Sequence, residues 1–258
     1  TRGTGKTTCA KILARAVNCE HPVNGDPCNE CAACRGILDG SVLDVTEIDA
    51  ASNNGVDNIR DLRDETRYTP AQVKKRVFII DEVHMLSIGA FNALLKTLEE
   101  PPEHVLFILA TTELHKVPAT ILSRCQRFDF RRIGAEDIAR RLLDVAAGES
   151  IALTEGAARL IARLADGAMR DALSMLDRAA AAGAVDEQTV TAALGVMGQD
   201  DGIRLAEHLK TGDLAAAIAL IDEYYNAGRD LAAVYDQMLG LIRDALLVKT
   251  SKTDVSAL

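Results

Sequence analysis

The sequence has no apolar run of about 18 residues, the length that a membrane-spanning helix needs, although 48% of its 258 residues are hydrophobic. It shows no secretory leader, no internal repeat of fixed period and no low-complexity segment. It has no excess of positive charge either, since its formal net charge is −9. These absences argue against a membrane protein and against a general nucleic-acid binder, while the apolar content suffices for two or three domains.

Six cysteines are present, and four of them lie between residues 19 and 34. Their order is Cys19-x8-Cys28-x2-Cys31-x2-Cys34, a set of four thiolates that can surround Zn²⁺ at about 2.3 Å each and leave no open position. We therefore expect a structural zinc site in a reducing, cytoplasmic compartment. An iron–sulfur cluster and chance spacing remain alternatives, and His21 could compete as a ligand. Cys9 and Cys125 lie outside the set.

The first residues contain the end of a phosphate-binding loop. Gly5-Lys6-Thr7 completes the pattern GxxxxGK[ST], whose first glycine would stand before Thr1. We therefore expect a chain that is cut inside its own nucleotide site. Gly3 and Gly5 permit a tight turn, Lys6 would reach the β and γ phosphates, and the Thr7 hydroxyl would bind Mg²⁺. The residues expected to bind ATP are Gly3, Thr4, Gly5, Lys6, Thr7 and Thr8. The alternative is a glycine turn before a helix with a surface lysine.

An acidic pair follows a short apolar run. Asp81-Glu82 comes directly after Val77-Phe78-Ile79-Ile80, a run that fits a buried parallel strand. Both carboxylates would then lie at the carboxyl end of a strand, where sites form in α/β sheets. We expect Asp81 to hold the Mg²⁺ shell and Glu82 to polarise the attacking water. The alternative is an acidic loop after a core strand.

The remaining pattern predicts an α/β domain with a parallel sheet, followed by an all-α half. The expected strands are residues 43–48, 77–80, 105–110 and 127–130, and the expected helices are residues 7–18, a segment after the turn at 52–55, and residues 91–100. In the first helix, the apolar residues on one face are Ile12, Leu13, Ala16 and Val17. From Ile133 onward alanine and leucine dominate and β-branched runs cease, so we expect one domain boundary near residue 133 and another near Gly198.

The order of motifs resembles the gamma/tau family, the ATP-driven subunits of the bacterial DNA polymerase III clamp loader. The shared series is Gly5-Lys6-Thr7, the four cysteines, Ile80-Asp81-Glu82-Val83-His84, Ala110-Thr111-Thr112, Ser123-Arg124-Cys125 and Gly167-Ala168-Met169-Arg170. The resemblance covers residues 1–200, whereas the remainder matches only in being helical.

The resemblance implies a RecA-like AAA+ P-loop ATPase domain with a zinc insert, then a small helical lid and the start of a helical collar. The corresponding domains are residues 1–132, with the zinc module at about 19–34, residues 133–197 and residues 198–258. It also implies that Thr112 is the sensor of the γ phosphate, that Arg124 is an arginine finger acting on the neighbouring subunit's ATP, and that Arg170 is a second sensor. From the residues alone, both arginines fit solvated side chains or ion pairs equally well.

The implied function is ATP hydrolysis that opens a sliding clamp and loads it on primer–template DNA. The implied partners are other clamp loader subunits in a pentameric ring, the clamp, the DNA and the polymerase core, the last through regions absent from this sequence. The helix after the turn at 52–55 is expected to meet DNA phosphates with its N-terminal end; a surface helix without ligand is the alternative. Two other functions stay open, a non-hydrolysing subunit of the same assembly and another AAA+ motor, such as a branch-migration helicase subunit.

Overall fold

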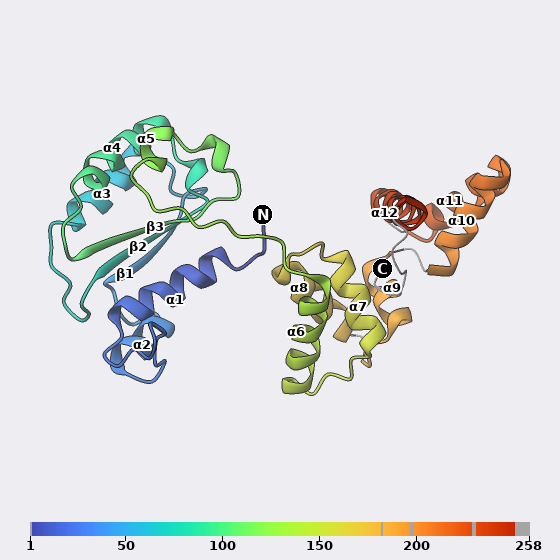
Figure 1. Cartoon of the computed structure of the whole chain (residues 1–258), viewed down its shortest axis with the longest axis horizontal. Coiled ribbons are helices and arrows are strands. Elements are labelled where there is room, and N and C mark those ends of the chain that lie inside the picture. The colour runs from blue at the N-terminus through green and yellow to red at the C-terminus, as the bar shows by residue number, and fades with distance from the viewer. Residues whose placement is uncertain (1, 182, 197–198, 229–230, 251–258) are drawn as a thin grey trace. The chain divides into compact units, whose positions relative to one another are not determined.

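The computed structural model describes residues 2–181, 183–196, 199–228 and 231–250 (Figure 1). The chain divides into two compact units, Thr1–Arg132 and Ile133–Leu258. The boundary expected near Gly198 lies outside the described residues, as does the end of the expected collar at 251–258. Within the described ranges, every helix is too short or too polar to cross a membrane.

The first unit alternates helices with three strands. Its elements are α1 (Lys6–Asn18), α2 (Ala32–Leu38), β1 (Val45–Asp49), α3 (Val56–Glu65), β2 (Arg76–Asp81), the 3₁₀ turn Val83–Met85, α4 (Ile88–Glu99), β3 (Val105–Leu109), the 3₁₀ turn Leu114–Lys116 and α5 (Ala119–Leu122). The strands form a parallel sheet in the order β1-β2-β3. The predicted α/β domain with a parallel sheet is confirmed.

The central strand β2 is buried on both faces. Successive side chains of a strand point to opposite faces, so Val77 and Ile79 pack against the alanines of α1. Phe78 and Ile80 belong to the core on the other face, which α3, α4 and α5 supply. Figure 1 shows α1 and α2 on one side of the sheet and α3, α4 and α5 on the other. This double burial explains the uninterrupted apolar run before Asp81.

The buried face of α1 differs from the apolar face that the sequence predicted. Ala10 and Ala14 are buried, whereas Ile12 and Leu13 are 37% and 44% exposed. Residues four positions apart share a helix face, and two small side chains on that face let the helix approach the sheet closely. Val17 still packs against this cluster, so the prediction is wrong for Ile12 and Leu13.

The strand expected at residues 127–130 is absent from the described sheet. The segment forms no ladder with β1, β2 or β3, and the side chain of Phe128 is 70% exposed. A strand needs a neighbour for its backbone N–H and C=O groups. Alternating charged and aromatic residues therefore did not suffice to define a strand.

The regular elements of the second unit are all helices within its described residues, as predicted, apart from one isolated β-bridge between Leu153 and Val185. Its helices are α6 (Ala135–Gly148), α7 (Glu155–Leu164), α8 (Met169–Ala180), α9 (Glu187–Leu194), α10 (Gln199–Thr211), α11 (Leu214–Asn226) and α12 (Leu231–Thr250). One apolar core is shared by the helices α6, α7, α8 and α9. A second core is shared by α10, α11 and α12. The side chains of Thr154, Asp186 and Asp213 cap the N-termini of α7, α9 and α11, which explains where those helices begin.

Candidate nucleotide site and cysteine cluster

The glycine loop turns into α1 through left-handed backbone. Gly3 has φ 70°, and Gly5, the N-cap of α1, has φ 86° and ψ 19°. Glycine adopts this region without steric cost. A Cβ at Gly5 would meet no atom within 4 Å, so conformation, and not crowding, requires glycine here. The first N–H groups of α1 have no partner within the helix, and such groups bind phosphate well.

Thr7 and Asp81 are in direct contact at the carboxyl end of β2. The Thr7 hydroxyl, in the first turn of α1, donates to Asp81 Oδ2 at 2.7 Å, although the two residues are 74 positions apart. Asp81 ends β2, and its other oxygen accepts the backbone N–H of Glu82 at 2.9 Å. A hydroxyl and a carboxylate side by side are hard oxygen donors of the kind that Mg²⁺ prefers. The residues present therefore fit a nucleotide-associated Mg²⁺.

Glu82 is held by a residue from the next strand connection. The backbone N–H of Thr112 and its hydroxyl both donate to Glu82 Oε2, at 3.0 Å and 2.8 Å. Thr112 follows β3, so the carboxyl ends of two adjacent parallel strands bring these residues together. Glu82 itself has φ 46° and ψ 47°, a conformation that costs a non-glycine residue about 1 kcal/mol or more. Such strain at the predicted base is typical of a functional position.

The two predicted arginines belong to different units of the chain. Arg124 follows α5, and its guanidinium pairs with Glu99 at 2.7 Å and donates to the Thr120 carbonyl at 2.7 Å. Arg170 is exposed in the first turn of α8, in the second unit. Arg124 thus makes its described contacts near the end of α4 and not with the phosphate loop.

The turn at 52–55 precedes a helix, as predicted. Helix α3 begins at Val56 with Gly55 as its N-cap, and no side chain caps it. Ser52 donates to Asp49 Oδ2 at 2.9 Å, so the turn is held by β1. The N-terminal N–H groups of α3 therefore lack a side-chain cap.

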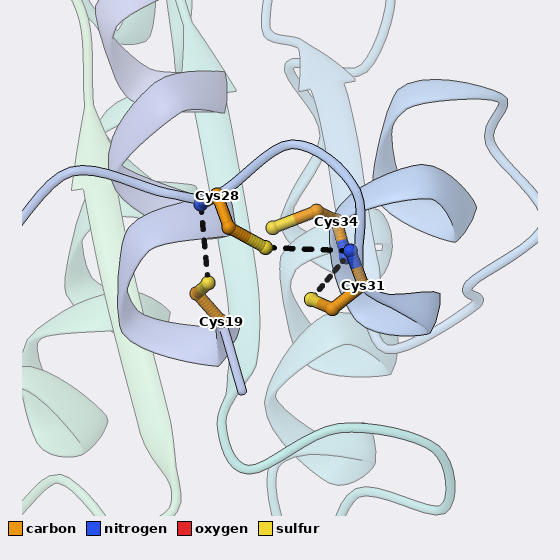
Figure 2. Close-up of side chains that lie close together, drawn as sticks. All are labelled: Cys19, Cys28, Cys31 and Cys34. Atoms are coloured by element: carbon orange, nitrogen blue, oxygen red, sulfur yellow. Dashed lines mark hydrogen bonds between the residues drawn. The ribbon is translucent and has the colours of Figure 1, made fainter. Parts of the chain in front are cut away.

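The four clustered cysteines converge on one point. Their Sγ atoms all lie within 4.8 Å of one another, and Figure 2 shows the four side chains directed toward a common centre. Cys19 ends α1 and Cys31 is the N-cap of α2, where its sulfur accepts the N–H of Cys34. A tetrahedron with zinc–sulfur bonds of about 2.3 Å needs sulfurs about 3.8 Å apart. Donor type, number and spacing all fit Zn²⁺.

Three of the four cysteine thiols have pKa values shifted from the ordinary value of a thiol. A hydrogen bond from the backbone of Glu20 lowers the pKa of Cys31 to about 6. Burial raises the pKa of Cys34 to about 12, and a backbone hydrogen bond from Cys28 lowers that of Cys19. Neighbouring thiols that differ in this way do not all ionise without a positive charge between them. A metal ion would supply that charge.

Sequence reasoning gave no role to His84, although it belongs to the shared series of motifs, and it did not identify Glu113. His84 lies 3.2 Å from Glu82 Oε2 through Nδ1 and 3.1 Å from Glu113 Oε2 through Nε2. The sequence carried one signal for them, which is that both lie close to predicted site residues. His84 follows the acidic pair, and Glu113 follows Thr112. Their contact depends on the 3₁₀ turn after β2, which no local pattern predicted.

Three family models together match nearly the whole chain. Residues 1–134 match a model described as "DNA polymerase III, delta subunit". Residues 137–185 match "DNA polymerase III clamp loader subunit, ATPase lid domain", and residues 185–257 match "DNA polymerase III subunits gamma and tau domain III".

Curated relatives carry related names. The chain is 54% identical over 253 residues to DNA polymerase III subunit tau of Bacillus subtilis, which covers 97% of this chain and 45% of that protein. It is 45% identical over 253 residues to the tau subunit of Escherichia coli, with coverage of 97% and 39%. It is 38% identical over 252 residues to the gamma subunit of Buchnera aphidicola subsp. Schizaphis graminum, with coverage of 97% and 69%. The chain thus spans less than half the length of the two tau relatives.

Among solved structures, the chain is similar to the Thermotoga maritima RuvB Holliday junction branch migration motor. The TM-score is 0.53 and the identity 16%, and the match covers 93% of this chain and 77% of that one. Identity this low supports a common AAA+ fold only. The gamma-subunit relative and the family models identify the family as well as the fold, since they match nearly the full sequence. The chain belongs to the gamma/tau family of DNA polymerase III clamp loader subunits.

Proposed function

We propose that the chain is the ATP-hydrolysing part of a clamp loader motor subunit, which opens a sliding clamp and loads it on primer–template DNA. The contact between the Thr7 hydroxyl and the Asp81 carboxylate carries this proposal. This contact brings the end of the phosphate loop and Asp81 into one site. Glu82 follows Asp81 directly and donates its backbone N–H to the Asp81 carboxylate. A subunit without hydrolysis has no need of that arrangement.

The site residues divide the chemistry among them. The backbone of residues 3–8 binds the phosphates and Lys6 neutralises their charge. Bound Mg²⁺, with Thr7 and Asp81 as its protein ligands, would neutralise the charge that develops on the transferred phosphoryl group. Glu82 orients the attacking water and accepts its proton, and Thr112 holds the Glu82 carboxylate in position for that task.

Four further assignments concern the assembled subunit. Arg124 acts on the ATP of a neighbouring subunit, which its exposed position after α5 supports. Arg170 senses nucleotide from the lid domain, residues 133–197. Along the chain, the lid follows the ATPase domain, residues 1–132, and precedes the collar, residues 198–258. The partners are other clamp loader subunits in a pentameric ring, the sliding clamp, the polymerase core and DNA. The DNA phosphates meet the N-terminal end of α3, which no side chain caps. The site of action is the cytoplasm, because free thiols that bind metal suit a reducing compartment.

Cys19, Cys28, Cys31 and Cys34 hold Zn²⁺ in a structural role. The convergence of four sulfurs with no position left for a substrate supports this assignment.

The test of the motor function compares Lys6→Ala with Glu82→Gln in the full-length protein. We expect Lys6→Ala to lose ATP binding, because it removes charge neutralisation at the phosphates. We expect Glu82→Gln to bind ATP as the wild type does, but to hydrolyse it about 100-fold or more slowly, because it lacks the general base. Equilibrium binding of labelled ATP and phosphate release measure the two steps separately.

Two outcomes would contradict the proposal. Equal loss of ATP binding in both variants would remove the division of roles. A wild-type protein that assembles but neither binds nor hydrolyses ATP would instead be the non-hydrolysing structural subunit.

A further inference from the structure

We propose that His84 is a positioning residue for Glu82, with Glu113 as the anchor of the imidazole ring. The inference rests on the proposed role of Glu82 as the general base, and it assigns that base a support beyond Thr112.

The imidazole lies between two carboxylates. Nδ1 is 3.2 Å from Glu82 Oε2 and Nε2 is 3.1 Å from Glu113 Oε2, while the side chain of His84 is 8% exposed. Carboxylate oxygens accept hydrogen bonds and do not donate them, so a hydrogen shared in either contact belongs to the ring. The Thr111 hydroxyl lies 3.0 Å from Nδ1 and accepts the backbone N–H of Glu113 at 3.0 Å. The ring is thus held on both of its polar edges.

The backbone around His84 is also fixed. His84 is the middle residue of the 3₁₀ turn Val83–Met85. Val83 is buried, and its N–H donates to the Ala110 carbonyl at 2.9 Å. The same turn is N-capped by Glu82 in its left-handed conformation. A rigid turn therefore sets the distance between the imidazole and the base.

The contacts favour one orientation of the base. Thr112 N, Thr112 Oγ1 and His84 Nδ1 all approach Oε2 of Glu82, at 3.0, 2.8 and 3.2 Å. Two hydrogen bonds from Thr112 and the close approach of the imidazole hold Oε2 in place, so Oε1 is directed away from these groups. A base must stay within hydrogen-bond reach of the water that it activates, and a misplacement of about 1 Å can cost 100-fold in rate.

Three substitutions of His84 separate positioning from simple packing. The amide of asparagine can occupy the place of Nδ1, whereas that of glutamine reaches the place of Nε2. We expect His84→Ala to lower kcat for ATP hydrolysis by about 10- to 100-fold with an unchanged Kd for ATP, because only the orientation of the base is lost. We expect His84→Asn to recover most of kcat, because it keeps a donor toward Glu82. His84→Gln should stay close to His84→Ala.

The control is His104→Ala, which removes another partly buried histidine whose Nε2 lies 3.0 Å from the Thr66 carbonyl. It should lower the melting temperature and leave kcat unchanged.

Equal kcat for the asparagine and glutamine variants, or unchanged kcat in both, would overturn the inference even if His84→Ala does not fold. Glu82→Gln, measured alongside, distinguishes the two proposals. If it keeps wild-type kcat, the role of Glu82 fails; if it is inactive while His84→Asn and His84→Gln match the wild type, only the inference about His84 fails.

Discussion

Asp44 is a buried carboxylate that joins two segments of the first unit. It accepts the N–H groups of Ala71 and Gln72 at 2.9 Å and 2.8 Å, and it pairs with Arg76 at 3.0 Å. Burial raises the pKa of Asp44, but the hydrogen bonds from Gln72, Arg76 and Ala71 outweigh that effect, so the pKa lies below its usual value. The ionised form therefore stabilises the connection between the loop before β2 and the start of β1.

We expect Asp44→Asn to lower the free energy of unfolding at pH 7 by about 3 kcal/mol, because it leaves the Arg76 charge and one N–H donor poorly paired. The folded pKa is below the unfolded value of about 3.9, so the stabilisation is present above about pH 4 and is lost as the pH falls through the folded pKa. The difference between wild type and variant should therefore shrink below pH 4. Urea unfolding from pH 3 to pH 7 measures it, with Asp61→Asn on the exposed side of α3 as control. A difference that does not change with pH would exclude the ionised carboxylate as its source.

At the scale of elements, the cysteine cluster connects α1, α2 and the segment before β2. The Lys74 ammonium donates to the Cys19 carbonyl at 2.6 Å, and Val73 packs against the cluster. The buried Asn18 side chain accepts the Lys75 N–H at 2.7 Å and donates to the Lys75 carbonyl at 3.1 Å. The module is thus fastened to the start of β2, the strand that ends at Asp81.

We expect one equivalent of Zn²⁺ per chain, and we expect Cys31→Ser to lose most of it. The variant should also melt at a lower temperature, because bound zinc contributes folding free energy. Elemental analysis and thermal unfolding with and without chelator measure both effects. Cys9→Ser is the matched control, since Cys9 is exposed on α1 outside the cluster. A metal-free wild type that melts at an unchanged temperature would refute the zinc site, and iron in place of zinc would favour the iron–sulfur alternative.

At the scale of the whole molecule, the position of Arg124 bears on assembly. Its described contacts are with Glu99, Thr120 and Ser123 in its own neighbourhood. An arginine finger raises the rate of phosphoryl transfer by about 1,000-fold or more when it meets the developing charge. We propose that Arg124 serves a neighbouring subunit, because it is exposed and its described contacts are not with the phosphate loop of its own chain.

Mixed assemblies of Lys6→Ala and Arg124→Ala subunits test this assignment. Each variant alone should be inactive in ATP hydrolysis, and Arg124→Ala should still bind ATP as a single subunit. In mixed rings, some interfaces pair an intact phosphate loop with an intact finger, so partial activity should return. Phosphate release by verified mixed rings is the measurement. If Arg124 acted on its own ATP, every chain would lack one essential group and no mixture would recover.

The sequence by itself determined the features that depend on local pattern. The run Val77–Ile80 identified the central strand because burial on both faces demands consecutive apolar residues. The cysteine spacing identified the cluster because its members are close along the chain. The change in composition near Ile133 separated the α/β unit from the helical one.

Only the tertiary structure decided what depends on contacts between distant segments. The segment 127–130 has the alternation of a strand, but a strand exists only with a neighbour to accept its hydrogen bonds. The buried face of α1 was decided by how closely a helix can approach the sheet, which favoured Ala10 and Ala14 over larger side chains. The placement of His84 between Glu82 and Glu113 requires two parallel strands to end at one edge, with a tight turn after the first. Such distances are properties of the folded backbone, because residues remote in sequence acquire a fixed separation only when the sheet forms.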